Sequence, residues 1–145
     1  MFGEVKPFDW LMFGIEAIAL LLIAYEVFYS VYERRKTRER NIEIGERKKQ
    51  LFSLIAKGQA ILHHAPSVGQ FTEVDHWGKS VDEWTATVEK QLTEYSSEAA
   101  ISFAQVVVAS TPIPHIAPGA DWHYRALRAR LENLRNITEK AEVYY

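Results

Sequence analysis

The chain has 145 residues, a formal net charge of −2 at pH 7 and no cysteine. This length suits one small domain with an anchor and is too short for two large domains. The nearly balanced charge argues against nucleic acid as a partner, because domains that bind nucleic acid carry a basic excess. Without cysteine, the chain has no disulfides, thiol nucleophiles or cysteine-ligated zinc.

The first element in chain order is predicted to be a transmembrane helix over residues 10–32, after a short tail of residues 1–9. A helix of this length reaches about 34 Å, which exceeds a hydrocarbon core of about 30 Å. Its Leu, Ile, Phe and Val side chains contribute roughly −5 kcal/mol to insertion. Glu16 and Glu26 lie about 7 Å from the midplane, so their cost is partial and insertion is favoured. A buried helix of a soluble protein is the alternative.

A basic collar follows the predicted span, within a juxtamembrane linker over residues 33–45. Such an excess of basic residues marks the cytoplasmic side, so we expect the N-terminus outside and the C-terminal domain in the cytoplasm, at the cell inner membrane. A cleaved signal peptide would carry these residues before its apolar run. The collar also attracts anionic head groups, so the lipid bilayer is the first predicted partner. Its members are Arg34, Arg35, Lys36, Arg38 and Arg40.

Residues 46–145 are predicted to form a small cytoplasmic antiparallel bundle of about four helices, which makes the chain all-α. Apolar residues from Leu51 to Leu62 recur at helical spacing and define its first helix. Pro66 and Gly69 end that helix. Gly45 is a candidate hinge, and the sequence leaves open whether one helix runs unbroken from the span into the bundle.

The second helix of the bundle is predicted from two V-D-x-W motifs that begin seven residues apart. Spacings of three and four residues place their apolar members on one face of a helix. Two tryptophans on that face bury large areas, so we expect it to form the centre of the core. The stripe contains Val74, Trp77, Val81, Trp84, Val88 and Leu92.

A third helix is expected over residues 96–108, with Ser96 or Ser97 as its N-cap. The β-branched run Val106–Val108 also suits a short strand, but a lone strand has no evident pairing partner, and helix is preferred. A loop rich in proline follows over residues 109–120. Its Ile113 and Ile116 lie outside any periodic pattern, so they either pad the bundle or contact a partner.

The last helix is predicted to begin with Asp121 as its N-cap, and its buried row includes Leu127, Leu131 and Leu134. Four arginines are interleaved with these leucines. We interpret them as a solvated face, because a nucleic-acid site would need an unbalanced basic surface. They are Arg125, Arg128, Arg130 and Arg135.

One pair of residues has the spacing of a metal-binding motif. Glu73 and His76 lie three residues apart, as in carboxylate-bridged di-iron bundles, but the chain holds no second copy of this motif. His63 and His64 are adjacent and point about 100° apart on a helix, so they ligate one ion poorly. No phosphate-binding loop or nucleophile motif is present. We therefore assign no catalytic, cofactor-binding or metal residues, expect no cofactor and predict a protein that is not an enzyme.

Two packing motifs carry a resemblance to known proteins. The first is W-x3-V-x3-L in the second bundle helix, and the second closes the last helix. In these the chain resembles small uncharacterised bacterial single-pass membrane proteins with a cytoplasmic helical domain. The resemblance implies a bacterial membrane location and no defined activity. The matching residues are Trp84, Val88, Leu92, Arg130, Leu131, Leu134 and Ile137.

Three functions of different kinds follow from these observations. The first is a membrane-anchored interaction module that docks or regulates a protein partner, or associates with itself. The second is a subunit of a larger membrane assembly that uses Glu16 and Glu26 as polar contacts within the span. The third, ranked last, is a metal-dependent enzyme built on Glu73 and His76.

Overall fold

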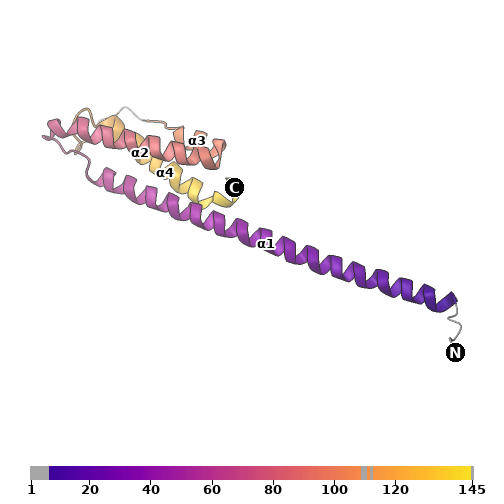
Figure 1. Ribbon diagram of the computed structural model, residues 1–145. Coiled ribbons are helices and arrows are strands. Elements are labelled where there is room, and N and C mark those ends of the chain that lie inside the picture. The colour runs from indigo at the N-terminus through magenta and orange to yellow at the C-terminus, as the bar shows by residue number, and fades with distance from the viewer. Residues whose placement is uncertain (1–6, 109–110, 112, 145) are drawn as a thin grey trace. The chain divides into compact units, whose positions relative to one another are not determined.

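The computed structural model describes residues 7–108, 111 and 113–144, with the backbone alone for residues 7–9. Within these residues the chain is helical and contains no strand, as the all-α prediction requires (Figure 1). It divides into two compact units, Met1–Glu43 and Ile44–Tyr145. The elements are α1 (Pro7–His63), a 3-10 helix η1 (Phe71–Glu73), α2 (Val74–Tyr95), α3 (Ser97–Ala104), α4 (Asp121–Glu139) and α5 (Ala141–Tyr144).

In the unit Met1–Glu43, the described residues belong to α1. The apolar side chains between Trp10 and Tyr32 are exposed all around the helix. Ser30 Oγ donates a hydrogen bond to the Val27 carbonyl oxygen at 2.9 Å, so this hydroxyl is satisfied within the helix. The most apolar 18-residue window has a mean hydropathy of 2.1 and no buried residue, so α1 is long and apolar enough to cross a membrane by length and composition.

Helix α1 continues through Gly45, which is helical. Its C-terminal part belongs to the second unit, Ile44–Tyr145, and supplies the buried residues Leu51, Leu54 and Ile55. Helix α2 is hydrogen-bonded to that part, α3 packs on α2 and α4, and the result is a helical bundle.

The core of the second unit forms around the two tryptophans of α2. Trp84 Nε1 donates to the Leu54 carbonyl oxygen at 2.9 Å, and Trp77 Nε1 donates to the Ile61 carbonyl oxygen at 2.8 Å. These bonds satisfy both buried indoles and fix α2 against α1. The Trp84 ring meets the Phe103 ring of α3 edge to face, with centroids 5.8 Å apart.

The residues that the sequence predicts as core, namely the stripe on α2 and the leucine row on α4, lie largely inside the bundle. Val74 is half-buried against the core, and the other members are buried. The buried members are Trp77, Val81, Trp84, Val88, Leu92, Leu127, Leu131 and Leu134.

Helix α3 begins as predicted but is shorter than predicted. Ser96 Oγ accepts a hydrogen bond from Ala99 N at 3.3 Å and caps the helix. The helix then ends at Ala104, and Val106–Val108 are neither helix nor strand, so both alternatives for this run are wrong. The physical reason lies on α4, where Asn133 Nδ2 donates to the carbonyl oxygens of Ser102 at 3.1 Å and Gln105 at 2.9 Å. This side chain satisfies the carbonyl groups that a longer helix would pair internally.

Helix α4 begins one residue earlier than the predicted cap implies. Ala120 is the N-cap and Asp121 is the first helical residue, without a side-chain capping bond. Gly119, with φ of 92°, makes the turn that precedes the helix. Asp121 still stabilises this end, because a carboxylate in the first turn interacts favourably with the helix dipole.

Candidate functional site

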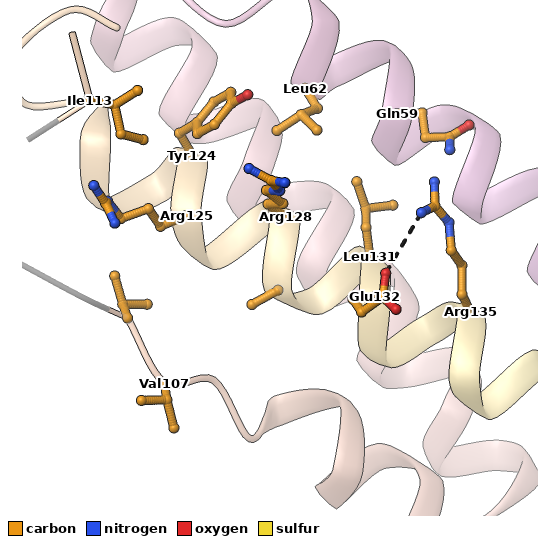
Figure 2. A pocket seen from close by; sticks show the side chains of 12 residues that line it. Gln59, Leu62, Val107, Ile113, Tyr124, Arg125, Arg128, Leu131, Glu132 and Arg135 are labelled. Atoms are coloured by element: carbon orange, nitrogen blue, oxygen red, sulfur yellow. Dashed lines mark ion pairs between the residues drawn. The ribbon is translucent and has the colours of Figure 1, made fainter. Parts of the chain in front are cut away.

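A groove of about 830 Å³ lies on the surface of the second unit (Figure 2). One wall is α4, and the last turns of α1 face it. Residues 107, 108 and 113, from the connection between α3 and α4, complete the lining. We call this site the α4 groove. Its apolar lining residues are Leu62, Val107, Val108, Ile113, Tyr124, Ala129 and Leu131, and its polar ones are Gln59, Arg125, Arg128, Glu132 and Arg135.

Val107 is the most solvent-accessible apolar side chain of the groove, with 97% of its surface exposed. Its place follows from the early end of α3, because Asn133 holds the Gln105 carbonyl oxygen and the chain leaves the helix just before Val107. The two isoleucines of the connection differ in their surroundings. Ile116 packs against the core, whereas Ile113 is half-buried and lines the groove.

Three arginines of α4 give the groove an excess of positive charge. Arg135 Nη1 lies 3.7 Å from Glu132 Oε2, and this pair is exposed (Figure 2). Arg125 Nη2 donates to the Thr111 carbonyl oxygen, and Arg125 Nε is buried without a hydrogen-bond partner among the described residues. Arg128 is exposed and makes no ion pair within the described part of the chain. One acidic side chain thus faces three cations.

The interpretation of four arginines as one solvated face is only partly right. Arg130 points away from the α4 groove, is half-buried, and its Nη1 lies 3.4 Å from Thr85 Oγ1 on α2. The other three line one groove together with apolar side chains. Sequence reasoning missed this site because Val107 and Arg128 are distant in the chain.

The polar residues of the predicted span are exposed on α1. The side chains of Glu16 and Glu26 make no ion pair or hydrogen bond to another described residue. The five collar residues, Arg34 to Arg40, are also exposed on α1 and follow the apolar stretch directly.

The fold brings Glu73 and His76 together with His64 around a shallow hollow of about 550 Å³. His64 Nδ1 lies 2.7 Å from the Ala60 carbonyl oxygen, so this nitrogen is already occupied. Among the described residues, no group of three or more His, Cys, Asp or Glu side chains is placed to hold a metal ion.

A contact between α2 and α4 was not anticipated from the sequence. His123 Nδ1 lies 3.7 Å from Asp82 Oδ1 and is otherwise buried without a hydrogen-bond partner in the described residues. A side chain at Gly78 would place its Cβ 3.5 Å from His123 Nε2, so the histidine packs closely on α2. We interpret this contact as structural.

Comparison with protein-family models, with curated proteins and with solved structures finds no match for this chain.

Proposed function

We propose that the chain is a single-pass protein of the cytoplasmic membrane whose helical unit docks or regulates a protein partner at the cytoplasmic face. One observation carries the proposal: the exposed apolar stretch Trp10–Tyr32 of α1 is followed at once by the basic collar. A helix that is apolar on all sides requires an apolar environment, which a bilayer supplies.

The proposed orientation rests on the collar. Basic residues within a short distance of a span are retained on the cytoplasmic side, so the N-terminal tail lies outside and the unit Ile44–Tyr145 lies inside. The same side chains interact with anionic head groups, each contributing about 1 kcal/mol near the surface.

The α4 groove supports the proposed docking role. Its exposed Val107, its half-buried apolar side chains and its excess of positive charge are features of recognition surfaces. A metal-dependent enzyme ranks lower, because Glu73 and His76 border an open hollow in which His64 is tied to the backbone.

A second candidate function concerns the span itself. Glu16 and Glu26 are exposed carboxylates in an apolar helix, without partners among the described residues. Intramembrane acids usually face protein or a water-filled cavity. The chain then acts as a subunit of a membrane assembly, with these two side chains as contacts to another span.

The proposed function is tested first by fractionation. The full chain is expected to remain in membranes after an alkaline wash and to be released only by detergent. Purification in mild detergent followed by mass spectrometry then identifies what is bound to it. Release of the chain by the alkaline wash overturns the membrane span, and recovery of a chain with no stoichiometric partner and no self-association overturns the docking role.

A further inference from the structure

We infer that the α4 groove binds an amphipathic helix of a protein partner, with an apolar face bordered by acidic side chains two helical turns apart. The inference rests on the proposed function and specifies the chemistry of the docked partner. Three features of the groove carry it: an apolar lining in which Val107 is exposed, the spacing of Arg128 and Arg135, and the excess of positive charge.

The apolar lining favours an apolar ligand face. Val107, which lines the same groove as the half-buried Ile113, is 97% exposed. A ligand that covers this side chain gains binding free energy, because apolar surface is removed from water. Leu62 and Tyr124 extend the apolar surface to α1 and along α4 (Figure 2).

The cations of the groove have helical spacing. Arg128 and Arg135 are seven residues apart on α4, which corresponds to about 10.5 Å along the axis and about 20° around it. Acidic residues at positions i and i+7 of a helix laid along the groove have the same separation. Such a helix matches both guanidinium groups at once while its apolar face covers Val107 and Ile113.

The two guanidinium groups are not equivalent. Arg135 already pairs with Glu132, whereas Arg128 makes no ion pair within the described part of the chain. An acid that approaches Arg135 also meets the Glu132 carboxylate. We therefore expect Arg128 to contribute more to binding than Arg135.

The spacing favours a peptide over an anionic lipid. A lipid head group concentrates its charge at one place and is best held by converging cations. Here Arg128 and Arg135 lie about two turns apart on α4, beside apolar side chains. The experiment below also tests whether an anionic lipid binds the groove.

The test uses the full chain in nanodiscs of neutral phosphatidylcholine. The probe is a synthetic amphipathic helix with leucines on one face and glutamates seven residues apart, and its control carries lysines in place of the glutamates. Because the chain has no cysteine, Gln59→Cys attaches a fluorophore at the groove alone, and Lys79→Cys on α2 provides the matched label outside it. Peptide anisotropy gives the affinity, and the two labels locate the bound peptide.

The acidic peptide is expected to bind and to change the emission of the Gln59→Cys label but not of the Lys79→Cys label. Arg128→Glu is expected to weaken binding by about tenfold or more, because attraction becomes repulsion. Lys79→Glu makes the same charge change outside the groove and should leave the affinity unchanged. Raising the salt from about 0.1 M to about 1 M shortens the Debye length from about 10 Å to about 3 Å and should weaken binding. Val107→Ser should weaken it several-fold with little salt dependence.

The inference is overturned if the lysine peptide binds as well as the acidic one, if neither binds, or if Arg128→Glu binds normally. It is also overturned if a short-chain phosphatidylglycerol changes the Gln59→Cys emission in an Arg128-dependent way and the acidic peptide does not displace it. Arg128 is exposed, so thermal unfolding of Arg128→Glu should match that of the parent and exclude misfolding as a cause. If the peptide does not bind as expected while the chain stays in membranes with its partners, the proposed function stands and only the assignment of the groove is wrong.

Discussion

Trp84 and Gly58 pack so closely that no side chain fits between them. A Cβ at Gly58 would lie 2.6 Å from Trp84 Cζ2 and 2.8 Å from Leu131 Cδ2. The indole cannot retreat freely, because its Nε1 donates to the Leu54 carbonyl oxygen one turn earlier on α1. Glycine at position 58 therefore permits the contact of α1 with α2 and α4 that organises the bundle.

Gly58→Ala is predicted to lower the free energy of unfolding. Alanine gains up to about 1 kcal/mol in helix propensity, but overpacking of this kind costs about 1–3 kcal/mol or more, and a rigid indole in the way favours the upper part of that range. The measurement is chemical unfolding of the purified chain. Gly45→Ala is the matched control, because its Cβ meets nothing within 4 Å, and it should stabilise the chain by about 0.5–1 kcal/mol. A stabilised Gly58→Ala would contradict the packing described.

Trp77→Ala and Trp84→Ala are each predicted to cost about 3–5 kcal/mol, a large share of the stability of a small domain. Both indoles are buried and hydrogen-bonded to carbonyl groups of α1. Trp122→Ala provides the comparison, since Trp122 is 56% exposed and its loss should change stability by no more than about 0.5 kcal/mol. Thermal and chemical unfolding of the three variants measures these losses of stability. Equal losses in all three would mean that burial does not determine how much stability each tryptophan contributes.

Asn133→Ala is predicted to destabilise the chain by about 1–3 kcal/mol, because the carbonyl oxygens of Ser102 and Gln105 lose their donor. Hydrogen exchange should accelerate in α3 as its C-terminal end loses support. The neighbouring Asn136→Ala removes an exposed amide for which the structure records no side-chain hydrogen bond, and it should leave exchange in α3 unchanged. Unaltered exchange in Asn133→Ala would show that α3 ends for another reason.

The long helical elements of the second unit could be predicted from the sequence because apolar periodicity is local information. The V-D-x-W repeat indicates α2, and the leucine row indicates α4. The end of α3 could not be predicted, since it depends on Asn133, which lies 28 residues beyond Gln105. The same limit applies to the α4 groove. Val107 and Val108 come from the connection after α3, whereas the arginines come from α4. No pattern within either segment shows that Val107 and Arg128 line one groove.

Neutralising all five collar residues, Arg34, Arg35, Lys36, Arg38 and Arg40, is predicted to scramble the orientation of the proposed span, because the basic excess that we propose retains this side in the cytoplasm is lost. A reporter that is active only in the cytoplasm, fused to the C-terminus, should be active in the parent and lose much of its activity in the variant. The matched control neutralises five basic residues farther from the span, Lys57, Lys79, Lys90, Arg128 and Lys140, and should retain the orientation. Activity of an exported reporter at the parent C-terminus would reverse the assignment.

Glu16 and Glu26 are ten residues apart, or about 1000° around the helix, so they point some 80° apart and occupy neighbouring sides of α1. If they contact another span, leucine at both positions should abolish co-purification or self-association, because it removes charge and hydrogen bonding together. Glutamine retains the size and the hydrogen bonding, so it should preserve much of the association. Ser30→Leu controls for added apolar surface, since the Ser30 hydroxyl bonds only within its own helix among the described residues.

The measurement is cross-linking in native membranes followed by purification in mild detergent. Association that survives leucine at both positions would mean that the span is an anchor and that the glutamates make no contact with a partner.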